Sequence, residues 1–410
     1  MTDPRVSRRG RRRAGPGGMR RAGRLRELLV SGVVDSFGLA LGWTLVVLIA
    51  TARGGLAEAA LYNAAMLVGV VLSAPVTGWL ARHLDGRVLL RGAAGIEVML
   101  RFGTLFGLIA GWPAWLIAVL VAVQHVAAWA GFAGMRAEVS AVDSSARSMT
   151  RYAVSIAGVE AAGTALAALL PVGPHGYPTG GLLIAVFVVY LGSLLPTVLV
   201  ARRARIAPAP SVPVSFTWRL PQPRLLLAGA GVMLLASGPA LLAVPVTAEL
   251  HGDRWVAVAA IAFCAGTLLA TRAVTALGRL HLPAVLRWSL WGLGMLAGWI
   301  LAPHWAPLVL LAQFAAGLSQ TAFEGDMDAR VAVEARPESV TRDLAYSASV
   351  RALGGAVAVR LLPMLYAAPA IGLAASAASL ILGVITLLLW AALTVAPHLF
   401  RRTDPVQSAT

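Results

Sequence analysis

The sequence predicts an all-α polytopic membrane protein with twelve transmembrane helices in two pseudo-symmetric six-helix bundles. Three observations support this: the composition, the lengths of the apolar runs, and a repeat between the two halves. Of 410 residues, 58% are hydrophobic and only 13% are charged, with a mean hydropathy of +0.77. Because a soluble chain averages about 25% charged residues, lipid must surround most of this one. A cytosolic enzyme, a secreted disulfide scaffold and a disordered polypeptide are excluded.

Twelve apolar runs are long enough to cross a membrane, since a helical span needs about 20 residues to cover about 30 Å of hydrocarbon. Prolines and glycines separate the runs that follow one another closely, as at Gly111-Trp112-Pro113. The expected spans are 28–52, 57–81, 92–110, 113–134, 151–171, 179–201, 224–248, 254–277, 284–302, 306–324, 345–367 and 369–396.

Arginine placement predicts the orientation of the chain. An even number of spans puts both termini on one side, and the connections on that side contain nearly all the arginines, whereas the opposite connections contain only Arg53 and Arg254. By the positive-inside rule both termini are cytoplasmic, in a multi-pass protein of the cell membrane. The net charge of +16 is not gathered on one folded face, so nucleic acid is excluded as a partner. Instead, we expect the arginine-rich tail, 1–27, to bind anionic lipid.

The longest polar connection, 202–223, contains five prolines and divides the spans six and six. We therefore predict an amino-terminal bundle at 28–201, a carboxyl-terminal bundle at 224–397, and a second cytoplasmic tail at 398–410. The halves repeat over the end of span 4, the following loop and span 5. The matched pairs are Phe132 with Phe323, Gly134 with Gly325, Ser148 to Arg151 with Ser339 to Arg342, and Leu169 to Pro171 with Leu361 to Pro363. Parallel six-span repeats are typical of secondary transporters.

With this organisation the chain resembles the major facilitator superfamily over residues 28–397. The loop between spans 2 and 3 contains a degenerate form of the family signature: Gly78 is present, Arg82 occupies the position of an aspartate, and Gly86-Arg87 comes one residue late. The resemblance implies that this acidic position latches the cytoplasmic side against span 11. Either Arg82 pairs with Asp343 as a charge-swapped latch, or Arg82 is simply solvated.

Two signatures of the drug/proton antiporter subclass are absent. Ala127 stands where span 4 commonly has an arginine four residues before Gly131, and Gly158 and Gly163 of span 5 occur without the accompanying proline. A relative that has lost transport activity therefore stays an open alternative.

The resemblance implies that spans 1, 4, 7 and 10 line a central path. Polar and titratable side chains on spans 1, 4 and 10 are then the candidates for binding substrate and protons: Asp35, Gln124, His125, Trp129, Gln313 and Gln320. A carboxylate in a low dielectric and an imidazole can each bind a proton exchangeably. A packing role for His125, and a wet cytoplasmic position for Asp35, are the alternatives.

Other charged groups are candidates for gating or contact between the bundles: Arg82, Arg87, Glu97, Arg101, Glu160, Arg272 and Asp343. Glu97 and Arg101 are four residues apart, share a helix face and can pair. Glu160 and Arg272 lie on spans 5 and 8, neighbours across the family's interface, where they form either a gating salt bridge or a structural contact. The acidic cluster of Glu324, Asp326 and Asp328 is expected to be solvated and paired within its own loop, not a metal site.

These observations predict a monomeric secondary active transporter. We expect it to move a small amphipathic organic molecule by alternating access, with protons as coupling ion and export as the direction. No phosphate-binding loop is present, so neither nucleotide hydrolysis nor another cofactor is expected. Uptake of a small metabolite is the alternative within this class. A membrane-embedded enzyme of lipid or cell-wall chemistry is the alternative outside it, but the short, nearly uncharged outer loops are unsuited to catalysis, so we predict no enzymatic activity.

Overall fold

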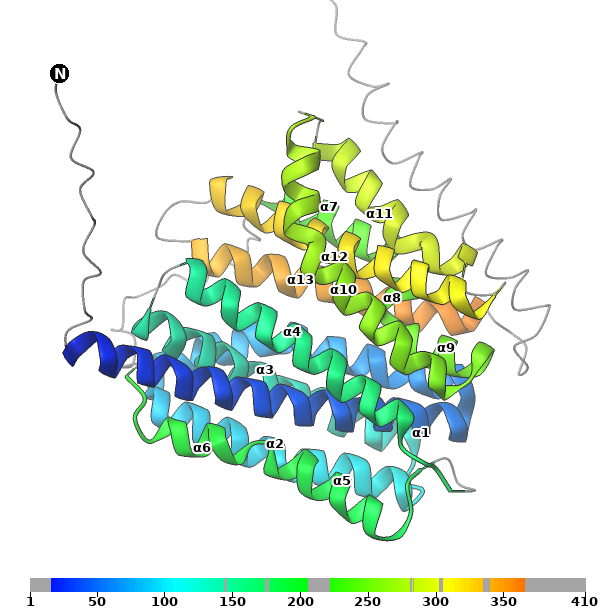
Figure 1. The fold of residues 1–410 in the computed structure, drawn as a ribbon, viewed down its shortest axis with the longest axis horizontal. Helices are drawn as coiled ribbons and strands as arrows, with labels where there is room; N and C mark the ends of the chain where they lie inside the picture. Colours follow the sequence, from blue (N-terminus) through cyan, green and yellow to red (C-terminus); the bar gives the residue numbers. More distant parts are fainter. Residues whose placement is uncertain are drawn as a thin grey trace, which may run out of the picture.

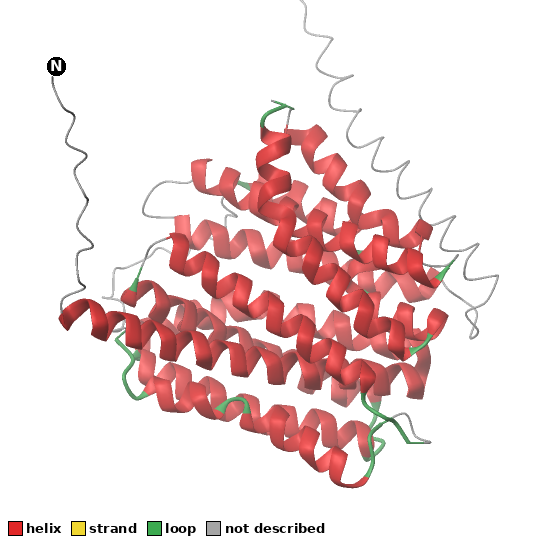
Figure 2. Cartoon of the chain, in the orientation of Figure 1, coloured by secondary structure: helices red, strands yellow, loops and turns green. Residues whose placement is uncertain are grey.

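A computed structural model describes residues 16–143, 146–173, 177–205, 222–280, 282, 284–301, 305–334 and 340–365, which contain helices and loops and no strand (Figure 2). The all-α prediction is confirmed. The predicted span at 369–396, both ends of the chain and most of the linker lie outside the described residues.

Thirteen helices make up the described part of the chain (Figure 1). Their bounds are α1 Pro16–His83, α2 Gly86–Ile109, α3 Ala114–Val142, α4 Ala146–Leu169, α5 Gly180–Gly192, α6 Leu195–Ala201, α7 Pro223–Ala236, α8 Gly238–Leu241, α9 Ala243–His251, α10 Asp253–Gly278, α11 Ala284–Leu301, α12 Ala306–Glu334 and α13 Val340–Leu365. By length and composition, the described residues contain six helical stretches that could cross a membrane: α1, α2, α3, the stretch formed by α5 and α6, α10 and α12.

The first two predicted spans both lie in α1. Its 68 residues are interrupted by the non-helical backbone of Gly54 and Gly55, and Gly55 has a φ of 65°. Only glycine adopts such a φ without strain. Leu45 and Ile49 before this point share one core with Ala59 and Tyr62 after it, so the two arms of α1 lie side by side (Figure 1).

The described helices pack in two groups. In the first, α1 packs on α3 and α4, and α2 packs on α3; in the second, α10 and α11 pack on α12, and α7 packs on α13. The main contacts between the groups are those of α1 with α13, α4 with α10, and α1 with α9. The hydrophobic core around Trp291, Phe323 and Met327 also includes Leu56 and Leu67 of α1, so apolar packing continues across the seam between the bundles.

The seventh predicted span is broken, whereas the sequence predicted a continuous helix over 224–248. It consists of α7, α8 and α9, interrupted near Ser237 and Leu242. Pro239, in the first turn of α8, has no backbone N–H to donate and restricts the residue before it. The Ser237 hydroxyl donates to the Met233 carbonyl and so satisfies one backbone acceptor at the break.

Helices α3 and α12 are longer than predicted. They end at Val142 and Glu334, whereas the hydropathy pattern placed their ends at 134 and 324. Hydropathy measures the apolar thickness of the bilayer, and a helix continues beyond it where its polar residues have good helical propensity, as Arg136 to Glu138 do.

Helices α10 and α12 cross so closely that only glycine fits at the contact. A Cβ atom on Gly266 would lie 2.1 Å from the Phe314 carbonyl oxygen, and a Cβ on Gly317 would lie 2.1 Å from the Phe263 carbonyl oxygen. Without a hydrophobic driving force between helices in lipid, such close backbone packing is a main source of association.

Replacing Gly317 by alanine should therefore push the two helices apart and destabilise the fold. Overpacking of this kind costs about 1–3 kcal/mol, and the measurement is the apparent unfolding temperature in detergent. Gly325→Ala, on the same helix, is the matched control because nothing lies within 4 Å of its Cβ position. Equal unfolding temperatures for the two variants would contradict the proposed tight crossing.

Candidate functional site

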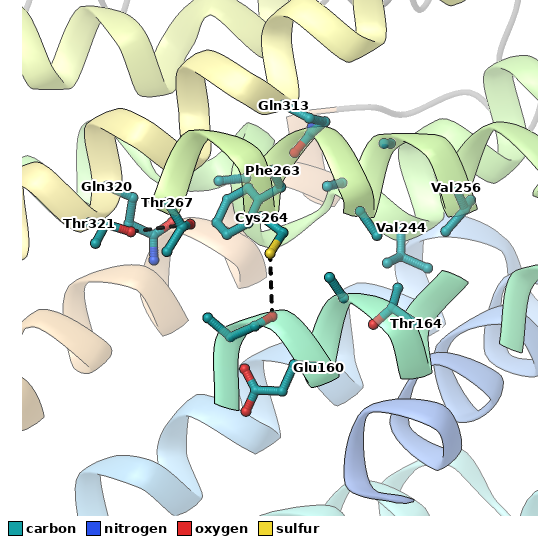
Figure 3. Close-up of a pocket in the computed structure, with 16 residues that line it drawn as sticks. Glu160, Thr164, Val244, Val256, Phe263, Cys264, Thr267, Gln313, Gln320 and Thr321 are labelled. Carbon is teal, nitrogen blue, oxygen red and sulfur yellow. Dashed lines mark hydrogen bonds between the residues drawn. The ribbon is translucent and has the colours of Figure 1, made fainter. Parts of the chain in front are cut away.

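A cavity of about 350 Å³ lies between the two bundles (Figure 3). Helix α4 of the amino-terminal bundle forms one wall, and α8, α9, α10 and α12 of the other bundle form the rest. A space of this volume matches the binding sites of small organic molecules. Its walls come from both halves of the chain, so any rotation of one half against the other changes the shape of the cavity.

The lining is largely apolar, with a few polar groups. Alanine and valine dominate, Phe263 adds an aromatic ring, and the polar side chains are Glu160, Thr164, Cys264, Thr267, Gln313, Gln320 and Thr321. Several of them have partners at the wall: Thr321 Oγ1 donates to Thr267 Oγ1 (3.3 Å), Gln320 Nε2 to Glu324 (3.2 Å), and Cys264 Sγ to the Ala157 carbonyl (3.6 Å). Thr44 Oγ1 of α1 donates to Thr164 Oγ1 at 3.2 Å.

Of the residues predicted to bind substrate, only Gln313 and Gln320 line this cavity. Sequence analysis missed its threonines and the helix break that positions Ala240 and Ala243 at its edge. The break could have been found, because Gly238-Pro239 inside an apolar run is the pattern of the discontinuous helices at transporter binding sites. The threonines gave no comparable signal, since small hydroxyl residues occur throughout membrane helices.

Glu160 lines the cavity and makes no salt bridge with Arg272. The Arg272 side chain is exposed on α10, and the described part of the chain contains no hydrogen bond or ion pair to the Glu160 carboxylate. The predicted neighbourhood of their helices is confirmed, since α4 packs against α10, but the predicted salt bridge is absent from this conformation.

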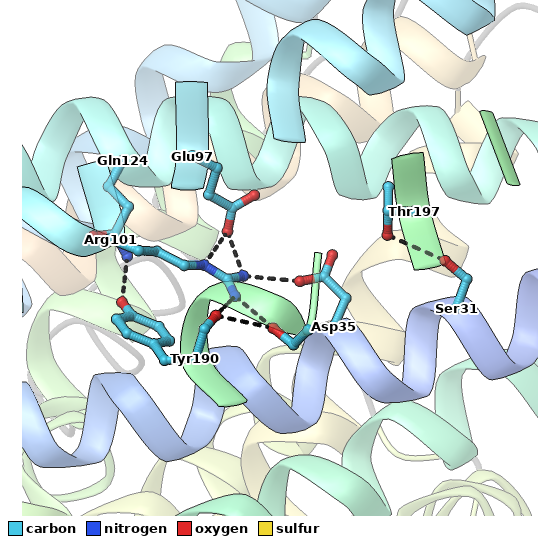
Figure 4. A network of polar contacts seen from close by, with 8 residues as sticks. Ser31, Asp35, Glu97, Arg101, Gln124, Tyr190 and Thr197 are labelled. Carbon is cyan, nitrogen blue, oxygen red and sulfur yellow. Dashed lines mark hydrogen bonds and ion pairs between the residues drawn. The ribbon is translucent and has the colours of Figure 1, made fainter. Parts of the chain in front are cut away.

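A second polar site lies inside the amino-terminal bundle, around Arg101 (Figure 4). The Arg101 guanidinium donates to Glu97 at 2.9 Å and to Asp35 at 2.8 Å. It also donates to the Tyr190 carbonyl and the Ser193 hydroxyl, both at 2.8 Å, and lies 5.0 Å from the centroid of the Tyr190 ring. This network joins α1, α2 and α5.

The predicted pairing of Glu97 with Arg101 is confirmed, but it lies within one bundle rather than between the two. Asp35 belongs to the same network and not to the cavity. The exposed fractions of the side chains are 1% for Arg101, 3% for Glu97 and 17% for Asp35, so Asp35 is the least buried member of the network. Two carboxylates share one guanidinium here, which leaves a net negative charge unless one carboxylate holds a proton.

The remaining predicted binding residues also lie away from the cavity. Gln124 Nε2 donates to the Tyr190 hydroxyl at 2.9 Å. His125 is buried and donates from Nδ1 to the Val121 carbonyl at 2.8 Å. Its ring packs edge-on against the Trp43 ring, with the two ring centroids 4.9 Å apart. Trp129 is 40% exposed.

The other gating candidates have separate outcomes. Arg87 donates to the Arg202 carbonyl at 2.9 Å and so joins α2 to the end of α6 within one bundle. The side chains of Arg82 and Asp343 lie outside the described residues, so the proposed latch stays a prediction.

The acidic cluster pairs with other helices rather than within its own loop. Asp326 pairs with Arg287 of α11 at 2.8 Å, and Asp328 pairs with Arg351 of α13 at 2.6 Å. Among the described loop charges, Arg330 and Glu334 pair locally at 3.0 Å, whereas Arg336, Glu338 and the side chain of Arg342 lie outside the described residues. The described residues contain no group of three or more potential metal ligands.

No family model matches the sequence, and no curated protein matches it either. The fold, however, is similar to those of solved transporters. The nucleoside transporter NupG superposes with a TM-score of 0.66 at 12% identity, over 91% of this chain and 98% of that one. The chain has the major facilitator fold. The xylose transporter XylE from E. coli superposes with a TM-score of 0.59 at 10% identity, over 88% of this chain and 95% of that one. A bacterial homologue of the lysosomal transporter Spinster superposes with a TM-score of 0.58 at 16% identity, over 96% of this chain and 100% of that one.

Removing the Arg101 charge from this major facilitator fold should destabilise it strongly. Arg101→Leu leaves Asp35 and Glu97 buried without a cation, and breaking a buried ion pair costs about 3–5 kcal/mol. The measurement is the unfolding temperature in detergent, with Arg272→Leu at an exposed position as the control. The triple variant that also contains Asp35→Asn and Glu97→Gln should recover part of the loss, because no charge then lacks a partner. Wild-type stability of Arg101→Leu alone would show that the network does not stabilise the bundle.

Proposed function

We propose that this protein is a secondary active transporter of the cytoplasmic membrane that moves a small amphipathic organic molecule by alternating access. The observation that supports this best is the cavity between the bundles, with α4 as one wall and helices of the other half as the rest. A site shared by two pseudo-symmetric halves is opened to one side or the other when the halves rock. The transporters with similar folds add independent support.

The chemistry of the lining favours an amphipathic substrate. Alanine, valine and phenylalanine suit an apolar body, whereas threonine hydroxyls and glutamine amides suit a polar group. A polyanionic metabolite would find no cation among the lining residues. We propose export as the direction, since compounds of this kind enter the cell through lipid without a carrier. Uptake of a small metabolite is the second candidate.

We further propose that protons drive the transport. Asp35, Glu97 and Arg101 form a cluster with two carboxylates and one cation, and a proton on one carboxylate would make it neutral. Asp35 is the least buried of the three side chains, so we propose that the proton enters and leaves there. His125 is a second candidate, through the ring nitrogen that does not donate to Val121.

The remaining features of the proposal follow from the sequence. The arginine distribution supports cytoplasmic termini and contact of the basic tail with anionic lipid. A chain with two halves already encloses the pathway, which supports a monomer. The described lining residues offer no paired acid and base for catalysis, and the solved structures with similar folds are transporters, so we propose a carrier rather than an enzyme.

Counterflow of candidate compounds in proteoliposomes tests the transport proposal, and Cys264 makes the test specific to the cavity. Because Cys264 is the only cysteine and lines the cavity, N-ethylmaleimide should block counterflow in the wild-type protein and not in Cys264→Ser. Exchange that is insensitive to the reagent in both proteins would place the pathway elsewhere. A chemically altered product would indicate an enzyme instead.

Neutralising the proton site should separate the driving force from the transport pathway. Asp35→Asn leaves Arg101 paired with Glu97, so the bundle stays neutral and folded while the exchangeable proton is lost. We expect loss of accumulation driven by a proton gradient, with counterflow retained. His125→Gln tests the second candidate in the same assay. Wild-type accumulation by both variants would remove Asp35 and His125 from the coupling mechanism.

A further inference from the structure

Glu160 is the only residue with a full charge among the sixteen that line the cavity (Figure 3). The other polar side chains there are threonines, glutamines and Cys264, which are uncharged as thiol, hydroxyl or amide groups. No contact joins the Glu160 carboxylate to the other side chains drawn in Figure 3, and the described part of the chain offers it no hydrogen bond or salt bridge. The Glu160 carboxylate, the only one among the described lining residues, is therefore available to a ligand.

Several titratable groups of the described residues surround Glu160, and Arg136 is the cation among them. Arg136 of α3 acts on the carboxylate electrostatically, but its guanidinium lies 5.7 Å from the centroid of the Phe132 ring and its side chain is exposed. From α12, Glu324 accepts a hydrogen bond from Gln320. Tyr152 of α4 and Cys264 of α10 are the other titratable groups whose charges interact with Glu160. None of these groups supplies a direct counter-ion.

A carboxylate in a largely apolar cavity is unfavourable as a bare charge, because apolar surroundings solvate it poorly. Two species can remove that cost. One is a proton bound to the carboxylate, and the other is a cationic group of a ligand in the cavity. The apolar lining around Phe263 would then hold the body of that ligand, and the aromatic ring itself favours a neighbouring cation.

We propose that the cavity binds small organic cations, with a protonated amine at Glu160 and an apolar or aromatic body along α10 and α12. This inference rests on the proposed function and gives the charge of its substrate class. The proton and the ammonium group compete for one carboxylate, so a cation that enters displaces the proton. No bond to carbon is made or broken; the proton leaves Glu160 for water as the cation takes its place.

Cys264 provides a direct binding assay on the purified full-length protein. It is the only cysteine, and its sulfur lies at the cavity wall, 3.6 Å from the Ala157 carbonyl oxygen. A bound compound should slow its reaction with N-ethylmaleimide. The probes are 2-phenylethylamine, 2-phenylethanol and 3-phenylpropanoate, which are similar in size and are cationic, neutral and anionic at neutral pH.

We expect the amine to protect Cys264 at a concentration about tenfold lower than the alcohol does, which corresponds to about 1.4 kcal/mol, and the carboxylate to protect least. Protection by the amine, measured as the ratio of labelling rates with and without it, should weaken as the pH is lowered, because a proton then occupies Glu160. Protection by the alcohol should not change in this way.

Three variants assign the effect to Glu160. In Glu160→Gln, the amine and the alcohol should protect Cys264 equally. In Glu160→Asp, the amine should still protect Cys264 better than the alcohol does. Glu334→Gln is the matched control, since Glu334 forms an exposed pair with Arg330 at the end of α12, and it should behave as the wild type. An unchanged labelling rate without ligand shows that the cavity is intact in each variant.

Equal protection by amine and alcohol in the wild type, a preference that persists in Glu160→Gln, or no protection by any of the three compounds would overturn the cation site. The proposed transport function fails separately. Charge-selective protection without counterflow would support the cation site and refute transport. Counterflow of neutral compounds alone would support transport and refute the cation site.

Discussion

The cavity depends on one close contact, the crossing of α10 with α12 at Gly266 and Gly317. Helices in lipid gain little from apolar burial, because the lipid tails are as apolar as the side chains. They associate where their backbones can approach, and the two glycines bring each backbone against a carbonyl oxygen of the other helix. Thr267, next to Gly266, donates to the Gly317 carbonyl at 3.5 Å. This contact holds Cys264 and Thr267 on one wall beside Gln320 and Thr321 on the next.

The two bundles use their buried charges differently. The amino-terminal bundle places Arg101 deep in its interior, where five donors of one guanidinium match two carboxylates, a hydroxyl and a backbone carbonyl. Lysine could not replace it, since it lacks the planar fork. The described pairs of the carboxyl-terminal bundle, such as Asp328 with Arg351, have one cation per carboxylate. The cluster around Arg101 has two carboxylates for one cation, so we expect it to hold a proton more readily than these one-to-one pairs.

Much of the fold could be predicted from the sequence, because hydrocarbon imposes a length on each apolar run and requires backbone polar groups to be satisfied, as they are within a helix. The pairing of Glu97 with Arg101 followed from their spacing on one helix. The place of Asp35 did not, because its partner lies on another helix, and helix rotation decides whether a side chain faces the bundle or the central path. The same applies to Asp326 and Asp328, whose partners lie on α11 and α13 rather than nearby in sequence.

Helix α1 links the network of Asp35, Glu97 and Arg101 to the cavity. Asp35 lies on α1, and nine residues further along the same helix Thr44 donates to Thr164, which lines the cavity from α4. Trp43, beside Thr44, contacts His125. Under the proposed coupling, loss of a proton from Asp35 would strengthen its attraction to Arg101, and a shift of α1 that followed would move the Thr44 hydroxyl that donates to Thr164. The charge state of Asp35 would thereby reach the wall that contains Glu160, although no contact among the described residues joins the two carboxylates.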